Sequence, residues 1–301
     1  IDLIFQERIN EINKPLNRVN IIFEEKIIDK KTIKFNSEID KPIIYNSFYS
    51  KFDEIISNYK KDLLRKKHSQ KDNFLSNVNY LINNIKDDKK RNFIKKILPS
   101  ISNYNKIILA ERRQLIQIRD YLNVHKTLLK KDQQFLENLA NKYSVSIKNT
   151  HKIDIIDNLM SNVDIIPNSI VLAQAANESG WGASRFAKDY NAFFGQYTYD
   201  SNLGVVPAER PIGKKHLIKY FSSIDESVQS YFYNINTHHA YKEFRELRKK
   251  LRQEGLSLDI KLLLSKLDSY AEDKNYIKSI NSIISKNKLQ NLDNIDSYVS
   301  L

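Results

Sequence analysis

The 301-residue sequence predicts a mainly α-helical protein with one small β-hairpin region, preceded by a partly helical N-terminal segment. Two observations support this prediction. Apolar residues recur every three or four positions over most of the chain, which is the spacing of one helix face. Residues 192–221 depart from this pattern, because aromatic residues, Gly and Pro gather there as they do in hairpins and loops.

The composition restricts the possible chemistry. The chain carries a formal net charge of +13, which favours nucleic acid, acidic lipid or an anionic cell-wall polymer, and which equally fits a solvated Lys-rich surface. The absence of Cys excludes disulfides, thiolate catalysis and Cys-based metal sites. No run of about eighteen apolar residues is present, so we expect no transmembrane segment. No export signal is visible in the sequence.

The N-terminal half is expected to hold an extension and a helical lead-in. Residues 1–85 are rich in Lys and Asn and contain no Gly, and an apolar stripe over 48–63 predicts one or two helices there. Residues 86–150 predict a helix that breaks near Pro99, because proline lacks the backbone donor that a helix interior needs. A further helix is expected over 132–143.

Residues 151–290 form the better-patterned domain, with 291–301 as a tail. All six glycines lie within it. We expect Asn168 or Ser169 to cap a helix that runs to about Ser179, with Gly180 in the left-handed conformation that often follows a helix end. The remaining segments predict a helix over 222–252, capped by Ser223 and Glu226, and helical structure over 258–286 with an interruption at 270–274.

Glu178 is the one acidic residue in the segment VLAQAANESGWGASRF. It falls in the last turn of its helix, where the negative end of the helix dipole disfavours a second negative charge. Partial burial beside Ala176 and Trp181 disfavours the charge again, so both effects raise the pKa. A carboxylic acid that stays protonated near neutral pH suits general acid catalysis of glycoside cleavage. The alternative from these residues alone is a surface Glu at a frayed helix end.

The sequence around Glu178 resembles that of a known family. QAANESGWGASRFAKDYNAFFGQ is similar to the signature of bacterial peptidoglycan N-acetylglucosaminidases, glycoside hydrolase family 73, and most similar to their Bax-like branch. Three more segments agree in order, and the resemblance covers residues 90–286. These segments are DNLMSNVDIIPNSIVLAQA, SSIDESVQSYFYNINTHHAYKEFRELR and SYAEDKNYIKSI.

The resemblance implies a lysozyme-like α+β fold, in which a helical body and a small β-hairpin lobe enclose a cleft. Glu178 falls on the family's catalytic acid, and Tyr270 falls on a Tyr that lines the site near the scissile bond. Tyr276 is expected to pack in the core. The chain departs from the family's Asn-Asn-Leu-Phe-Gly at Ala192, which removes one potential hydrogen bond.

A second acid is implied in the β-lobe, about thirty residues after the first. Glu209 lies 31 residues after Glu178 and is the expected residue, with Asp200 as a rival. Glu209 equally fits a hairpin-tip charge paired with Arg210. If there is no second acid, the N-acetyl group of the substrate is expected to attack the anomeric carbon. A separation of about 6.5 to 9.5 Å between the two carboxyls indicates inversion, and about 5 Å indicates a direct nucleophile.

Sugar rings present apolar faces with polar edges, so aromatic side chains in a groove suit them. The expected substrate-binding residues are Asn191, Phe194, Gln196, Tyr197, Tyr199 and Tyr241, with Gln196 as a donor to an acetamido group. Trp181 is expected to anchor the helix end instead. Adjacent His238 and His239 point to different helix faces and lack partners at ligand spacing, so no metal and no cofactor are expected.

The predicted function is hydrolysis of the β-1,4 bond after N-acetylglucosamine in peptidoglycan, with Glu178 as general acid. This substrate implies a periplasmic, envelope-associated or secreted protein. The alternatives are a muramidase or lytic transglycosylase of the same fold, and a catalytically weak glycan-binding envelope protein. Nucleic-acid binding rests on charge alone and is not expected, because the sequence holds no recognisable motif for it.

Overall fold

The computed structural model describes residues 57, 61, 78–206, 215–271 and 273–295. The chain divides into two compact units, 1–65 and 66–301, and every element named below lies in the second unit. The helix expected over 48–63 lies outside the described residues apart from residues 57 and 61. Among the described helices, none has both the length and the apolar character needed to cross a bilayer.

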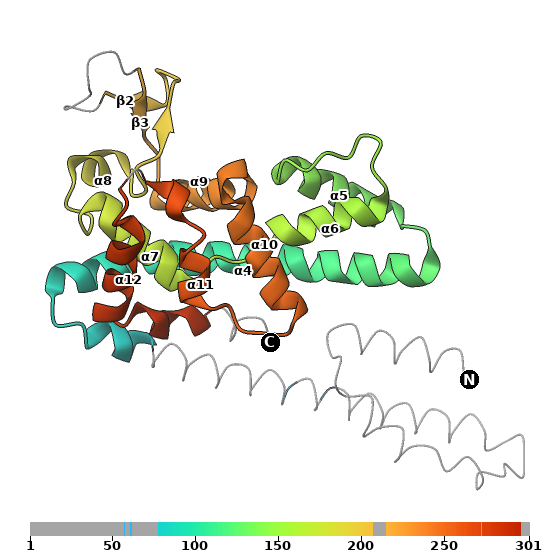
Figure 1. Ribbon diagram of the computed structural model, residues 1–301, viewed down its shortest axis with the longest axis horizontal. Coiled ribbons are helices and arrows are strands. Elements are labelled where there is room, and N and C mark those ends of the chain that lie inside the picture. Colours follow the sequence, from blue (N-terminus) through green and yellow to red (C-terminus); the bar gives the residue numbers. More distant parts are fainter. Residues whose placement is uncertain (1–56, 58–60, 62–77, 207–214, 272, 296–301) are drawn as a thin grey trace, which may run out of the picture. The chain divides into compact units, whose positions relative to one another are not determined.

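A single long helix, α4 (Asp88–His125), packs against α6, α7 and α9 (Figure 1). The predicted break at Pro99 is wrong, because the helix continues through this residue. Pro99 leaves the carbonyl of Lys95 without its usual helical donor, and both residues are exposed, so water can reach that carbonyl. The opposite face is buried and holds the helix in the core through Phe93, Ile94, Ile97, Leu98 and Ile101.

Two shorter helices, α5 (Lys130–Lys142) and α6 (Lys152–Asn162), follow α4 and pack against each other. The loop after α6 places Asp164 in the interior, where only 1% of its surface is exposed. Arg252 donates to both carboxylate oxygens of Asp164 over 3.1 Å, and the Arg112 guanidinium lies 3.7 Å from one of them. This buried ion cluster ties α4 to α10 (Lys242–Gln253).

Helix α7 (Asn168–Ser179) is buried over most of its length, with residues 168–176 each at most 1% exposed. It packs against α4, α12 (Tyr276–Lys286) and η3 (Leu289–Ile295). The predicted cap by Asn168 or Ser169 is wrong, because both lie inside the helix and Pro167 precedes it.

The carboxylate of Asp293 in η3 caps α7 instead. It accepts hydrogen bonds from the backbone N–H and from the hydroxyl of Ser169, both over 2.7 Å. A carboxylate in this position satisfies a free N–H at the helix start and interacts favourably with the helix dipole. The residue that caps this helix therefore lies 124 positions further along the chain, in the segment expected to be a tail.

A three-stranded antiparallel sheet forms the β-lobe, which extends from the helical body beside α8 (Arg185–Tyr190) (Figure 1). Its central strand is β3 (Leu217–Lys219), flanked by β1 (Tyr197–Thr198) and β2 (Gly204–Val205). The predicted small β-lobe is therefore confirmed, with one strand more than a hairpin. Residues 207–214 lie outside the described residues.

Helix α9 (Ile224–Thr237) starts as predicted, since the Ser223 hydroxyl accepts from the backbone N–H of Glu226. The prediction of one helix over 222–252 is wrong. The chain becomes extended at His238, forms a short 3₁₀ turn, η1 (His239–Tyr241), and then continues as α10. Arg245 stabilises this break by donating to the carbonyls of Ile235 and His238 over 2.9 and 2.8 Å.

The remaining elements bring the C-terminal part of the unit back to α7. They are α11 (Ile260–Leu264), the 3₁₀ turn η2 (Asp268–Tyr270), α12 and η3. The interruption expected at 270–274 agrees with the gap between η2 and α12. Helical elements therefore dominate the described residues, as the sequence predicts.

Candidate active site

Glu178 lies in the last turn of α7, directly before the residues that end the helix. Gly180 has φ +58° and its N–H bonds the carbonyl of Ala176, which confirms the predicted left-handed helix end. The next residue, Trp181, also has a positive φ of 59°. Its ring packs edge-on against Phe93, with ring centres 5.5 Å apart, and the Lys90 ammonium lies 5.1 Å from the ring centre. These contacts attach the turn after α7 to the start of α4.

The Glu178 carboxyl is half-buried. Burial raises its pKa above the ordinary value, while hydrogen bonds from Asn177 and Tyr276 oppose that rise. The contact from Asn177 is long, at 3.4 Å. The net effect favours the protonated carboxylic acid more than at an exposed Glu, in the direction that the sequence analysis expected.

Gly195, in the segment that leads into the β-lobe, lies directly against this carboxyl. It has φ +61°, and a Cβ placed on it would lie 3.0 Å from Glu178 Oε2. The absence of a side chain at Gly195 therefore lets the carboxyl oxygen lie directly over the backbone. This contact joins the end of α7 to the segment that leads into β1.

Two tyrosines stack beside Glu178. Tyr270 of η2 and Tyr276 of α12 have ring centres 5.6 Å apart and nearly parallel planes, 11° from each other. The Tyr270 hydroxyl donates to the carbonyl of Phe194 over 2.7 Å, which holds η2 against the segment before Gly195. Tyr276 is 3% exposed and packs in the core as expected, and the interaction of its hydroxyl with Glu178 lowers the pKa of that carboxyl.

Tyr276, Gly195 and Gln174 are not among the site residues predicted from the sequence. Gln174 precedes Glu178 by four residues, so the two share one face of α7. It is fully buried and donates to the Tyr276 hydroxyl over 2.8 Å. The spacing of Gln174 and Glu178 was a signal available in the sequence, whereas the contact with Tyr276 bridges 102 positions.

The residues expected to bind substrate fall into two groups. Tyr197 and Tyr199 of the β-lobe are exposed, at 62% and 82%. The ring of Tyr197 lies 4.5 Å from that of His216, which supports it from the neighbouring strand segment. These two side chains are free to contact a ligand.

The other predicted substrate-binding residues make internal contacts. Phe194 is buried and stacks on Tyr231 at 4.3 Å, and Tyr241 is also buried. The side-chain amide of Asn191 donates to the carbonyl of Phe221, and that of Gln196 donates to the carbonyl of Ser230. These four residues therefore hold the lobe and the helices together in the described structure.

Of the two candidates for a second acid, the structure describes only Asp200. Glu209 lies outside the described residues. Asp200 is exposed, and its carboxylate accepts from the backbone N–H of Asn202 over 2.8 Å within the turn after β1.

The histidines considered as metal ligands make a local contact. His238 accepts from the backbone N–H of Ala240 through Nδ1. Among the described residues, no three His, Asp or Glu side chains are grouped as a metal site requires.

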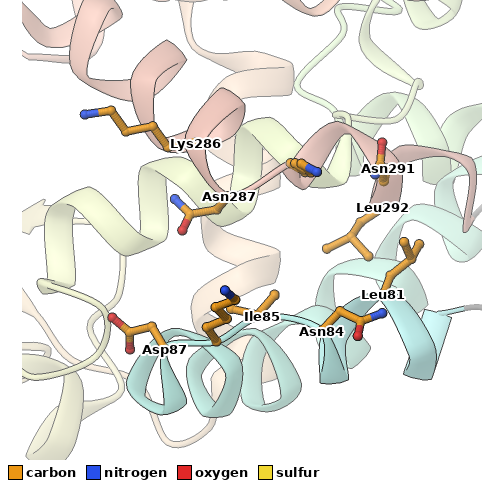
Figure 2. A pocket seen from close by; sticks show the side chains of 10 residues that line it. Leu81, Asn84, Ile85, Asp87, Lys286, Asn287, Asn291 and Leu292 are labelled. Carbon is orange, nitrogen blue, oxygen red and sulfur yellow. The ribbon is translucent and has the colours of Figure 1, made fainter.

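A cavity of about 480 Å³ lies elsewhere in the second unit (Figure 2). It is bounded on one side by residues 81–87 and on the other by 286–292, at the junction of α12 and η3. None of the predicted site residues lines it. We therefore assign the candidate site to the surroundings of Glu178 and not to this cavity.

Known proteins resemble the part of the chain that contains Glu178. The family model described as mannosyl-glycoprotein endo-beta-N-acetylglucosaminidase matches residues 153–289. Protein bax of Escherichia coli (strain K12) is 35% identical over 184 residues, and the chain spans 64% of that protein's length, using 61% of its own. The catalytic domain of the autolysin Auto from Listeria monocytogenes aligns over 58% of this chain and 94% of that domain, with 19% identity and a TM-score of 0.34. Residues 153–289 therefore resemble a glucosaminidase domain, and the chain is similar to part of bax.

Proposed function

We propose that the chain is a glycoside hydrolase that cleaves the β-1,4 bond after N-acetylglucosamine in peptidoglycan, with Glu178 as the general acid. The observation that carries this proposal is the Glu178 carboxyl itself. It is half-buried at the end of α7, lies against the backbone of Gly195, and has a pKa raised by burial. The family match over residues 153–289 supports the same class of reaction.

In the proposed reaction, Glu178 gives its proton to the glycosidic oxygen as the bond from that oxygen to the anomeric carbon breaks. The sugar departs as a neutral hydroxyl, and positive charge develops at the anomeric carbon. The electron pair that forms the new bond to the anomeric carbon comes from water or from the acetamido oxygen of the sugar that carries this carbon, not of the departing sugar. Burial assists this step because it keeps the acid protonated at a pH where an exposed Glu is ionised.

Glu209 is our proposed base for the attacking water. The stereochemistry of the first product tests this role, because activation of water by a second carboxylate inverts the anomeric carbon. A retained configuration excludes Glu209 as the base for an attacking water and indicates attack by the acetamido group or by a carboxylate nucleophile.

The proposed substrate contacts are the exposed rings of Tyr197 and Tyr199, which suit the apolar face of a sugar. The net charge of +13 favours an anionic envelope polymer over a neutral glycan. Since peptidoglycan lies outside the cytoplasm, we propose that the protein acts there. In this proposal 151–290 is the catalytic domain, 86–150 a helical lead-in packed on it, and 1–85 an extension.

Digestion of purified peptidoglycan sacculi tests the function. We expect soluble fragments with N-acetylglucosamine at their reducing ends, and no release by the Glu178→Gln variant. Glu137→Gln, a change on α5 at the surface, serves as the matched control and is expected to keep full activity.

Other products would contradict the proposal. Fragments with muramic acid at the reducing end, or with its anhydro form, indicate a muramidase or a lytic transglycosylase. Tight binding to sacculi without any release, in both the parent chain and Glu178→Gln, indicates a glycan-binding protein instead.

A further inference from the structure

A chain of buried hydrogen bonds leads from the core to Glu178. Tyr231 of α9 is 0% exposed, and its hydroxyl donates to Gln174 Oε1 over 2.5 Å. The Gln174 side-chain nitrogen donates in turn to the Tyr276 hydroxyl over 2.8 Å. Tyr231, Gln174 and Tyr276, from α9, α7 and α12, therefore form one hydrogen-bonded chain, and the Tyr276 hydroxyl at its end interacts with Glu178 and lowers the pKa of that carboxyl.

The direction of this network follows from its far end. A buried hydroxyl hydrogen needs an acceptor, and Gln174 Oε1 is the acceptor that the structure gives to Tyr231. With its oxygen facing Tyr231, the Gln174 amide must present its nitrogen to Tyr276. The Tyr276 oxygen then accepts from Gln174, and its own hydrogen remains available for Glu178.

None of these three side chains has a part in the proposed proton transfer, and all of them lie in the interior. We propose that Tyr276 is a positioning residue for the general acid, with its hydroxyl oriented toward Glu178 by Gln174 and Tyr231. This inference rests on the proposed function, because it concerns the geometry of the same carboxyl.

A fixed donor has two consequences for a carboxylic acid. It occupies one carboxyl oxygen as an acceptor, so the acidic proton resides on the other oxygen, in one orientation. It also stabilises the ionised form, so it limits how far burial raises the pKa of Glu178. Among the described residues, the titratable side chains that interact with Glu178 are Tyr270 of η2 and Tyr276 of α12.

The test is Tyr276→Phe, which removes the hydroxyl and keeps the ring. We expect kcat to fall by about 10- to 100-fold, the range for one hydrogen bond to a charged group, while KM changes by less than about twofold. The alkaline limb of the pH profile should move to higher pH, because Glu178 loses a donor that favours its ionised form. Carbon-13 NMR titration of the Glu178 carboxyl, assigned by its loss in Glu178→Gln, should show the same direction.

Tyr143→Phe is the matched control. Tyr143 is also buried, at 3% exposure, and its hydroxyl donates to the carboxylate of Glu111 over 2.8 Å, on elements that do not contain Glu178. We expect this variant to lose stability and to keep the pH profile of the parent. Tyr231→Phe removes the far end of the network and should shift the Glu178 titration in the same direction as Tyr276→Phe, by a smaller amount.

The outcomes separate this inference from the proposed function. If the parent chain releases nothing from sacculi, the proposed function fails, and the NMR titration still decides the role of Tyr276. If Glu178→Gln abolishes activity while Tyr276→Phe leaves the titration and the pH profile unchanged, the positioning role is refuted. Should Tyr276→Phe fail to fold, an unshifted titration in Tyr231→Phe refutes it equally.

Discussion

Replacement of Gly195 by Ala tests whether the backbone under Glu178 determines activity. The added Cβ would lie 3.0 Å from Glu178 Oε2, and ordinary contact begins at 3.4 Å, so the carboxyl must move by the difference. A displacement of about 1 Å in a catalytic group costs roughly 100-fold in rate, so on a logarithmic scale a displacement of about 0.4 Å costs roughly 5- to 10-fold. We therefore expect kcat to fall about 10-fold, equal to about 1.4 kcal/mol of transition-state stabilisation.

The same substitution also strains the backbone. An Ala at φ +61° adopts the left-handed conformation, which destabilises the folded chain by about 1–2 kcal/mol. Gly255→Ala separates the two effects, because Gly255 has φ +68° with no atom within 4 Å of its added Cβ. It follows α10 and should lose similar stability without losing activity.

Urea denaturation and steady-state rates on soluble peptidoglycan fragments give the two quantities for each variant. The reasoning is refuted if Gly195→Ala keeps the parent kcat at a temperature where it is fully folded. It is refuted also if Gly255→Ala loses as much kcat as Gly195→Ala.

Three further predictions follow from the buried acids and the lobe. Asp164→Ala leaves the guanidinium groups of Arg112 and Arg252 without a counter-charge. The free energy of unfolding, measured by urea denaturation, should fall by about 3–5 kcal/mol, and a fall below about 1 kcal/mol would contradict this prediction. Burial raises the pKa of Asp293 from 3.8 to about 6 in the folded chain, so ionisation of this carboxyl disfavours folding. The stability that protonated Asp293 contributes is fully present below pH 3.8 and is lost as the pH rises through 6. Asp293→Asn should remove this dependence from thermal unfolding curves, and an unchanged slope would contradict the assignment. Tyr199→Ala, at a side chain 82% exposed, should change stability by less than about 0.5 kcal/mol and raise KM by about 3- to 10-fold, whereas an unchanged KM would exclude Tyr199 from the glycan site.

Local signals in the sequence were sufficient for the ends of several helices. The left-handed Gly180 and the cap by the Ser223 hydroxyl depend on neighbours within a few positions, and the structure confirms both, although the Glu226 carboxylate accepts from Ser222 and not from Ser223. The placement of Glu178 in a last helical turn depends on the same kind of signal. Interactions within one turn of a helix are visible in the order of residues alone.

Interactions between distant segments were not predictable in this way. Pro99 remains inside α4 because tertiary packing of the opposite face outweighs one missing hydrogen bond. The cap of α7 comes from Asp293, and the partner of Glu178 comes from Tyr276, both more than ninety positions away. Neither interaction can be inferred from the residues next to it in sequence. The sequence therefore predicted only the burial of Tyr276, and Asp293 was expected to lie in a tail.

The hydrogen bonds between η3 and the start of α7 bear on how short an active fragment can be. The family match ends at residue 289, yet Leu292 accepts from the Asn168 side chain and Asp293 holds Ser169. A chain cut at the family boundary keeps Glu178 and Tyr276 while the first turn of the catalytic helix loses its anchor. If the proposed function holds, we expect the shortest active fragment to extend at least four residues past the family match, to Asp293.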